Sequence, residues 1–364
     1  MAVDTDLDIV RSESDDEPAE GVPSSDDRGM PGWKKALIVL CVLLLILAGG
    51  VVGGGLFLYH RYDHRVSRAD LLPDPASLGQ DQQQRADNWK SGALNLLLLG
   101  SDSRATAPGQ KSPIGERSDT IMLVHIAKSR TKATIISIPR DSFVQVPAAG
   151  SWKGGKNKIN AAFAYGGAKL AATTVHQLTG VPLDGAMIAN FASIHELVDA
   201  VDGVNVCVPY DVHSTFSTKV WRSGCHQMAG DEAEEFMRQR YEVPGGDFGR
   251  MYNQQLVVKA VIAKVSKGDL LTNPMKFDNL MVTVADALTV DKSLDLQQLA
   301  LAVRDIKPSN ITYATVPYAT ASLKTFAGTA VKLDDKQAAG MFAAVKNDTI
   351  DKWLAAHPQK APGA

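Results

Sequence analysis

Cysteine and histidine are scarce in this chain of 364 residues, which contains three cysteines and eight histidines. They show no spacing typical of a zinc site, which argues against a zinc enzyme or a zinc finger. Ser101 and Ser103 lack the nucleophile elbow of a serine hydrolase, and the glycine-rich and catalytic loops of a protein kinase are also missing. No internal repeat and no nucleic-acid-binding motif is present. The sequence therefore does not support a zinc protein, a serine hydrolase, a protein kinase or a nucleic-acid-binding protein.

Charged residues are absent from positions 36–59, a run of 24 residues. An apolar helix of this length can cross a hydrocarbon core of ~30 Å, and its length and isolation disfavour the alternative of a buried core helix. The run is too long and too far from the N-terminus for a cleaved signal peptide. Lysines precede it and arginines follow it, so the positive-inside rule is nearly balanced. We place this span in the cell membrane, with a cytoplasmic N-terminus and an extracytoplasmic C-terminal body.

The remaining chain divides by composition. Residues 1–35 are rich in acidic residues, serine, proline and glycine, which predicts a disordered cytoplasmic tail. Residues 60–92 are polar and rich in glutamine, and we interpret them as an extracytoplasmic linker. Residues 93–357 show no clear internal boundary. Two interpretations of their last hundred or so residues stay open, namely one layer of the same domain or a separate lobe. The net charge of −2 hides a mildly basic body, which suits an anionic ligand.

Apolar runs of strand length interleave with helical patterns along the body. Strands are expected at 95–99, 120–126, 133–138, 185–191 and 311–317, and helices at 159–178, 193–201, 231–240, 248–266, 294–303 and 334–356. The leucines from Leu96 to Leu99 do not alternate with polar residues, so we expect their strand to be buried on both faces. This order of elements predicts an α/β fold, a three-layer α/β/α sandwich with a mixed central sheet.

Two cysteines of the body form a candidate disulfide. Cys207 ends a strand-like run, and Cys225 follows the turn signal Ser223-Gly224. A hairpin would bring the two sulfurs together, and a disulfide fits an oxidising compartment outside the membrane. The alternative is a pair of ordinary buried thiols.

Two aspartates lie at the ends of expected strands. Asp102 comes just past the carboxyl end of the leucine-rich strand, where ligands bind in open α/β sheets. Asp119 precedes the next strand and adjoins Arg117. Two carboxylates that converge on one point suit Mg²⁺. Taken alone, they are better explained by turn chemistry at Asp102 and a solvated strand end at Asp119.

Three arginines lie near helix ends. Arg238 and Arg240 would point to opposite sides of a regular helix, so a shared ligand requires the helix to end near Arg240. The following Pro244-Gly245-Gly246 favours such an end. Arg250 begins the next helix, where the dipole favours anions. Arginine binds phosphate with two parallel hydrogen bonds, although each of these arginines taken alone is better explained as a surface residue.

Six ordered blocks between residues 93 and 265 resemble the signature of the LytR-CpsA-Psr family. They are Asn95 to Arg104, Arg117 to Leu123, Ser137 to Asp141, Lys158 to Asn160, Phe236 to Arg240 and Asp247 to Gln255. The chain departs from the family pattern in a somewhat long segment between Asp102 and Asp119. Tyr252 also stands where the family often has a basic residue.

The resemblance implies the role of each matching residue. Asp102 and Asp119 would hold Mg²⁺. The residues that would bind the pyrophosphate are Arg117, Arg140, Arg238, Arg240 and Arg250. The head-group site would be lined by Arg104, Lys158, Asn160 and Gln254. Asp247, or an acid near the metal, is the candidate general base.

The resemblance also implies a membrane-anchored, Mg²⁺-dependent phosphotransferase. It would move a phospho-glycopolymer from a polyprenyl-pyrophosphate carrier onto peptidoglycan, with no nucleic-acid partner. The carrier lipid needs an apolar channel, which segments 161–175 and 186–191 could line if they are not plain core. Two alternative functions would use the same ligand. One is a pyrophosphatase that uses water as acceptor, and the other is a non-catalytic receptor for lipid-linked sugars.

Overall fold

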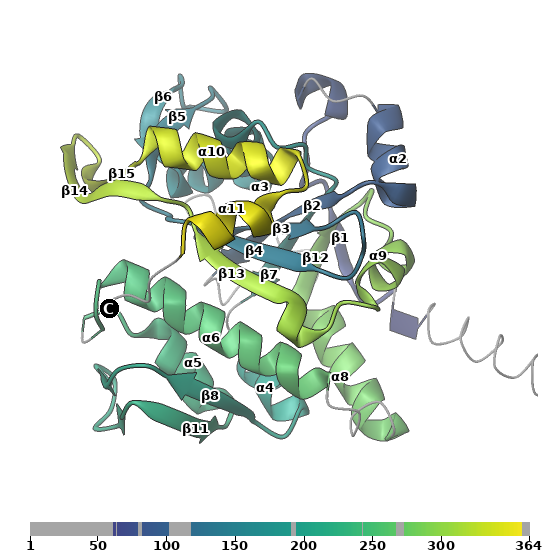
Figure 1. The fold of residues 1–364 in the computed structure, drawn as a ribbon, viewed down its shortest axis with the longest axis vertical. Coiled ribbons are helices and arrows are strands. Elements are labelled where there is room, and N and C mark those ends of the chain that lie inside the picture. Colours follow the sequence, from purple (N-terminus) through teal and green to yellow (C-terminus); the bar gives the residue numbers. More distant parts are fainter. Residues whose placement is uncertain are drawn as a thin grey trace, which may run out of the picture. The chain divides into compact units, whose positions relative to one another are not determined.

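The computed structural model describes residues 61–62, 64–78, 82–101, 118–190, 194–241, 243–266 and 273–358 (Figure 1), with the backbone alone at residues 101, 118, 119 and 190. The predicted cytoplasmic tail (1–35) and the predicted membrane span (36–59) lie outside the described residues. No helix within those described ranges combines the length and the apolar character needed to cross a bilayer.

A seven-stranded sheet lies at the centre of the described domain, in the order β1-β12-β7-β2-β3-β4-β13. The strands are β1 (Ser67–Ala69), β2 (Leu94–Ser101), β3 (Ser118–Ile126), β4 (Ala133–Ile138), β7 (Gly185–Asn190), β12 (Leu288–Asp291) and β13 (Ile311–Thr315). β2 pairs antiparallel with β3 and parallel with β7, while β13 pairs parallel with β4. The predicted α/β fold with a mixed sheet is confirmed. Because β12 and β13 are sheet strands, the last hundred or so residues belong to the same domain.

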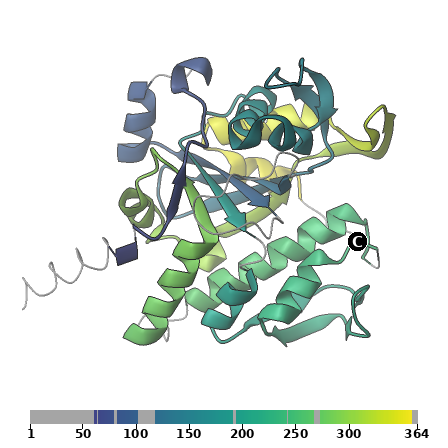
Figure 2. The ribbon, with the colours of Figure 1, turned by 180° about the vertical axis from the view of Figure 1, so that it is seen from behind.

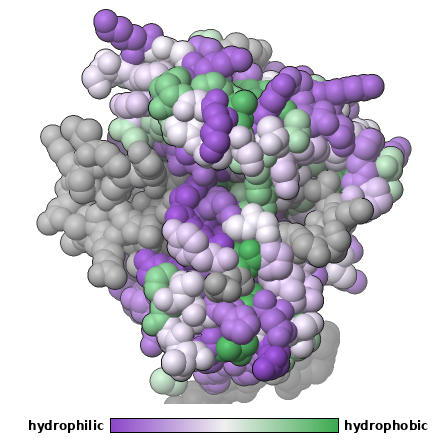
Figure 3. Space-filling model, turned by 90° about the vertical axis from the view of Figure 1, so that its left-hand side faces the viewer, coloured by the Kyte–Doolittle hydropathy of each residue, from purple (hydrophilic) through white to green (hydrophobic). Residues whose placement is uncertain are grey.

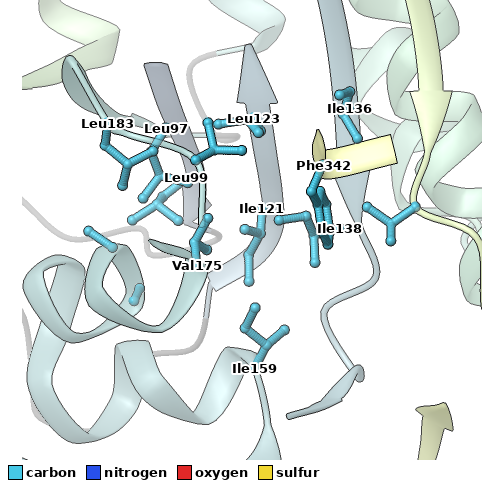
Figure 4. Packing of buried hydrophobic residues seen from close by; sticks show 14 of the residues in the cluster. Leu97, Leu99, Ile121, Leu123, Ile136, Ile138, Ile159, Val175, Leu183 and Phe342 are labelled. Atoms are coloured by element: carbon cyan, nitrogen blue, oxygen red, sulfur yellow. The ribbon is translucent and has the colours of Figure 1, made fainter. Parts of the chain in front are cut away.

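Leucines on both faces of β2 are buried, as predicted, and only Leu98 is partly exposed. Leu97 and Leu99 join a core cluster with Leu123 of β3, and Figure 4 shows these side chains together with the helical residues Val175 and Phe342. Leu94 and Leu96 join a second cluster on the opposite face. Leu94, Leu96, Leu97, Leu99 and Leu123 are each at most 2% exposed. Each contributes roughly 1.5–3 kcal/mol through the transfer of apolar surface out of water.

One face of the sheet is covered by α3 (Asn160–Thr179), α10 (Asp335–Lys346) and α11 (Ile350–Ala356). The single helix predicted over 334–356 is wrong, because the chain breaks between α10 and α11. Asp348 has a φ of 53°, a left-handed conformation that cannot continue a right-handed helix. Its carboxylate lies 2.9 Å from Nε2 of the buried His125, whose Nδ1 is 2.8 Å from Oδ1 of Asn95. His125 therefore has a structural role.

The opposite face is covered by α6 (Asp247–Val265), α8 (Pro274–Ala287) and α9 (Leu296–Val303). Figures 1 and 2 agree that α6 and α8 lie across the sheet from α3 and α10. Nε2 of Gln255 joins α6 to β4 by donating to Oγ of Ser137 at 2.8 Å. The sequence reading missed α8, although Asn273 caps it by accepting hydrogen bonds from two backbone N–H groups and Pro274 opens its first turn.

A smaller cluster packs against α6. It comprises α4 (Ile194–Ala200), β8 (Val204–Val208), β9 (Val212–His213), β10 (Val220–Trp221), β11 (Gly224–Met228) and α5 (Gly230–Arg238). Trp221 and Phe236 pack edge to face at its centre, with ring centroids 5.3 Å apart. Cys207 and Cys225 are directly opposite each other on β8 and β11, and their sulfurs are bonded.

The predicted linker is wrong over residues 64–78 and 82–91, which pack onto the domain. They contain β1, a 3-10 turn η1 (Pro75–Leu78) and α2 (Gln82–Ser91). Leu71 and Leu72 are buried, and both of their backbone N–H groups donate to Oδ2 of Asp291 at 2.9 Å. Polar composition concealed this docking, because the contacts are made with residues far along the chain, 220 positions away for Leu71 and 96 for Asn88.

Asp184 anchors α2 and predicts a pH dependence of stability. Its carboxylate accepts hydrogen bonds from Nδ2 of Asn88 and the backbone N–H of Asn95. Burial raises the pKa of Asp184 to about 6, although these bonds oppose the shift. Its folded pKa lies above the unfolded value, so stability is greatest below about pH 4 and falls as the pH rises through 6. Relative to Asp184→Asn, we expect the wild type to lose on the order of 2–3 kcal/mol of unfolding free energy between pH 4 and 7.

Denaturant unfolding of both proteins across this pH range measures the difference. If the difference in unfolding free energy between wild type and Asp184→Asn does not change with pH, the raised pKa of Asp184 is contradicted. Asp305→Asn, at an exposed carboxylate, serves as the control and should show no such trend.

Two hairpins were not anticipated from the sequence. The first is β5 (Phe143–Val146) with β6 (Gly155–Lys158), and the second is β14 (Tyr318–Thr325) with β15 (Gly328–Leu333). The backbone N–H of Val331 donates to the carbonyl of Asp141 at 2.9 Å, and Val331 forms a parallel bridge with Ser142. The two hairpins are thereby joined beside the carboxyl end of β4.

Candidate functional site

A cavity of about 630 Å³ lies beside the end of α5 and the start of α6. This volume is typical of sites for small ligands or head groups. Its lining residues are Ile194, Thr215, Phe216, Glu234, Met237, Arg238, Arg240, Tyr241, Arg250 and Gln254. Figure 3 views the left-hand side of Figure 1, where hydrophilic side chains gather in a hollow between the upper and lower parts of the domain. Four of the predicted ligand-binding residues therefore line one cavity.

The end of α5 places two of these arginines together. Arg238 is the last residue of the helix, and Gln239 leaves it with an extended backbone. Gln239 is fully buried, and its Oε1 accepts hydrogen bonds from the backbone N–H and Oγ1 of Thr215. Arg240 consequently lies beyond the helix and lines the same cavity as Arg238. The helix end that the sequence required for a shared ligand is present.

Asp247 is surrounded by three arginines. Its Oδ1 lies 2.9 Å from Nη2 of Arg250, 3.4 Å from Nη2 of Arg140 and 3.7 Å from Nε of Arg240. These arginines come from the first turn of α6, the end of β4 and the segment after α5. Nε of Arg140 also lies 3.9 Å from Oδ2 of Asp141. Among the described side chains, two carboxylates therefore face three guanidinium groups, and a net positive charge remains for an anionic ligand.

Lys158 and Asn160 lie next to Arg140, as the motif order implied. Nζ of Lys158 is 3.2 Å from Oδ1 of Asp141, and the backbone N–H of Asn160 donates to the carbonyl of Arg140 at 3.0 Å. The β5–β6 hairpin brings these positions together, because it starts just after Asp141 and ends at Lys158. The predicted head-group residues therefore adjoin the arginine cluster.

Gln254 connects α6 to the strand that carries Asp119. Its Oε1 accepts a hydrogen bond of 2.9 Å from Oγ1 of Thr120, the residue after Asp119. The backbone of Ser101 pairs with that of Ser118 at the adjoining ends of β2 and β3. Ser101 precedes Asp102 and Ser118 precedes Asp119, so the residues before the two predicted metal ligands are neighbours at one edge of the sheet.

Three predicted site residues lie outside the described residues, namely Asp102, Arg104 and Arg117. Asp119 is described by its backbone alone, as part of β3. Among the described side chains, no group of three or more histidines, cysteines or acids could hold a metal ion. The magnesium site at Asp102 and Asp119 therefore stays a prediction.

Glu234 is a site residue that the sequence reading missed. Its Oε1 lies 3.0 Å from Nη1 of Arg238, and its Oε2 lies 3.5 Å from Nδ1 of His195. A glutamate four residues before an arginine on a helix is a recognisable signal for such an ion pair. The contact restrains Arg238 at the cavity wall.

Tyr252, which departs from the family pattern, packs away from the cavity lining. Its ring centroid lies 6.4 Å from that of Tyr210, whose hydroxyl contacts Oδ1 of Asn253 at 3.3 Å. Burial raises the pKa of Tyr210 to about 12 and also raises that of Tyr252. Both phenols are therefore neutral at physiological pH and add no charge to the site.

The segments expected to line a lipid channel, or else to form plain core, contribute to the main core cluster. Ala162, Ala171 and Val175 of α3 and Ala186 of β7 are fully buried there. Phe191 lies outside the described residues.

Comparison with known proteins agrees with this arrangement. The model of the LytR_cpsA_psr family matches residues 74–347. The polyisoprenyl-teichoic acid–peptidoglycan teichoic acid transferase TagU of Bacillus cereus is 32% identical, over 73% of this chain and 83% of the relative. The cell wall biosynthesis protein LcpA of Corynebacterium glutamicum is 26% identical, over 81% of this chain and 61% of the relative. The crystal structure of protein gbs0355 from Streptococcus agalactiae is similar with a TM-score of 0.61 and 25% identity, over 71% of this chain and 89% of that one. The chain belongs to the LytR-CpsA-Psr family.

Proposed function

We propose that this chain transfers a phospho-glycopolymer from a polyprenyl-pyrophosphate carrier to peptidoglycan in the cell envelope. The observation that carries the proposal is the convergence of Arg140, Arg240 and Arg250 on Asp247 beside the cavity. A pyrophosphate is a compact multiple anion, and such a cluster suits it better than it suits a neutral ligand. The similarity to a teichoic acid transferase supports the choice of reaction.

The reaction needs little covalent help from the protein. A hydroxyl oxygen of the peptidoglycan sugar attacks the phosphorus that carries the glycopolymer. The bond between that phosphorus and the bridging oxygen breaks, and polyprenyl phosphate leaves. The arginines position the pyrophosphate and stabilise the charge that develops on the leaving oxygen. Asp247 is the described carboxylate nearest these groups, and we assign to it the proton of the attacking hydroxyl.

The carboxylates of Asp102 and Asp119 would hold Mg²⁺ in this proposal. Ser101 and Ser118, which directly precede the two acids in the chain, are paired at one sheet edge, and this supports a shared site. Carboxylate oxygens are the ligands that Mg²⁺ prefers. Bound there, the ion would neutralise charge on the phosphate oxygens.

The proposed location is the outer face of the cell membrane, with residues 36–59 as the anchor. The disulfide between Cys207 and Cys225 supports an oxidising compartment for the body, since cytosolic thiols are kept reduced. The uncharged run of 36–59 and the lipid carrier both fit a site held close to a bilayer.

Transfer can be measured with the full chain in detergent, a polyprenyl-pyrophosphate-linked sugar donor and peptidoglycan fragments. We expect phospho-sugar to be joined to peptidoglycan in Mg²⁺, and transfer to be lost with a chelator and restored by added Mg²⁺. Arg240→Ala should raise the donor KM by about tenfold or more, because it removes one charged phosphate contact. Arg304→Ala, at an exposed surface ion pair, is the matched control and should leave transfer unchanged.

The products separate the proposal from its alternatives. Free phospho-sugar without a peptidoglycan adduct would identify a pyrophosphatase. Saturable donor binding without any product would identify a receptor. Either result would overturn the proposed transfer.

A further inference from the structure

The two hairpins beside the arginine cluster expose aromatic rings. Phe326, between β14 and β15, is 76% exposed, and Tyr318 at the start of β14 is 44% exposed. Each ring is backed by a second one, with centroids 6.0 Å apart for Phe143 and Phe326 and 4.1 Å apart for Phe248 and Tyr318. Aromatic rings contribute strongly to interfaces, so exposed rings beside a site are candidates for ligand contact. They provide flat apolar faces of defined position.

These rings are continuous with the reaction site. Phe248 directly follows Asp247 in the first turn of α6, and its ring stacks on Tyr318 with an interplanar angle of 22°. Phe143 starts β5 two residues after Asp141, and Lys158 is its direct partner on β6. A chain that lies along these rings would therefore pass beside the carboxylate of Asp247.

The hairpins also carry charge of one sign. Between residues 142 and 158, and between 318 and 333, every charged residue is a lysine. These are Lys153, Lys156, Lys158, Lys324 and Lys332. The β5–β6 register places Lys156 opposite Gln145 and Lys158 opposite Phe143, on the face away from the buried Val144 and Asn157. Lysines and an aromatic ring therefore share the outward face of this hairpin.

We propose that this two-hairpin surface, formed by Phe143, Lys156, Lys158, Phe248, Tyr318 and Phe326, binds the glycan strand of the peptidoglycan acceptor. The inference rests on the proposed function. The apolar C–H faces of sugar rings pack on the faces of Tyr318 and Phe326. The lysines attract the free carboxylates of the stem peptides.

The position of Asp247 favours the acceptor over the donor polymer. Arg240 and Arg250, which contact Asp247, line the cavity, while the chain neighbour of Asp247, Phe248, stacks on Tyr318 of the hairpins. In an in-line displacement, the attacking and leaving oxygens lie on opposite sides of the phosphorus. With the donor pyrophosphate on the cavity side, the attacking hydroxyl approaches from the two-hairpin surface.

The test compares kinetic constants for the acceptor and the donor in the full chain. Phe326→Ala and Tyr318→Ala are each expected to raise the KM for peptidoglycan fragments about tenfold, with the donor KM unchanged. Tyr318→Phe keeps the stacked ring and should retain the wild-type acceptor KM. Leu301→Ala, at a side chain that is 52% exposed on α9, is the matched control and should have no effect.

A charge reversal tests the lysines separately. Lys156→Glu is expected to raise the acceptor KM severalfold at low salt, and the difference should shrink at high ionic strength. Lys90→Glu on α2 is the control, because its side chain is 72% exposed and lies outside the two hairpins. An equal effect of both reversals would reveal a general charge effect and overturn the assignment of Lys156.

Binding to purified peptidoglycan without donor distinguishes the two proposals. Weaker binding of Phe326→Ala than of wild type supports the two-hairpin surface, whether or not transfer occurs. Unchanged binding and an acceptor KM within about twofold of wild type for both aromatic variants would overturn it. In that case, transfer by the wild type would still uphold the proposed function.

Discussion

Asp247→Asn is expected to lower the kcat for transfer by about 10²–10⁴-fold, the usual contribution of a general base. Asparagine has nearly the same shape as aspartate, but it cannot take the proton of the attacking hydroxyl. The donor KM should not rise, because Arg140, Arg240 and Arg250 remain and one negative charge has been removed from among them. Steady-state kinetics with saturating acceptor separate these two effects.

The matched control for this variant is Asp305→Asn, which removes an exposed carboxylate that pairs with Arg304. It should have wild-type kinetics, and both variants should keep the wild-type circular dichroism spectrum. A kcat for Asp247→Asn within threefold of wild type would assign the proton transfer to another acid. A large rise in donor KM would instead identify Asp247 as a residue that only orients the arginines.

Replacing Cys207 and Cys225 by serine is expected to lower the free energy of unfolding by about 3 kcal/mol. The disulfide closes a loop with a sequence separation of 18, and without it the unfolded chain gains the entropy of that loop. The pair joins β8 to β11, which form the outer strands of the cluster around Trp221 and Phe236. Denaturant unfolding followed by tryptophan fluorescence measures the loss.

A reducing agent provides an internal check on this expectation. It should destabilise the wild type by a similar amount and leave the double serine variant unchanged. Cys41→Ser changes the third cysteine of the chain and keeps the disulfide. The reducing agent should therefore still lower the stability of this variant. Equal stability of wild type and double variant would show that native packing offsets the lost cross-link.

The sheet was largely predictable because its strands carry their own signal. β4 has the predicted bounds, and the uninterrupted leucines of β2 correctly predicted burial on both faces. Residues 64–78 and 82–91 were misread because polar sequence does not reveal contacts with Asp286, Asp291 or Asp184. The two hairpins were missed because their strands are short or irregular, and the β14–β15 pairing contains register shifts.

The site residues were predictable as a list, but their arrangement was not. Arg238 and Arg240 could be assigned to one ligand because the sequence after them breaks the helix. The contacts of Asp247 with Arg140 and Arg240 depend on how α6 packs across the ends of β4 and α5. That packing is set by buried groups such as Gln255 and Ser137, which are 118 positions apart. No local pattern could indicate it.

The pairing of Ser101 with Ser118 has a consequence for the length of the segment between them. The sheet itself holds the two strand ends together. The distance between them therefore does not depend on how many residues connect them. Doubling such a loop costs only about 0.6 kcal/mol in closure entropy. A longer segment between them therefore need not displace the backbone of Asp119, and the somewhat long segment in this chain costs little in closure entropy.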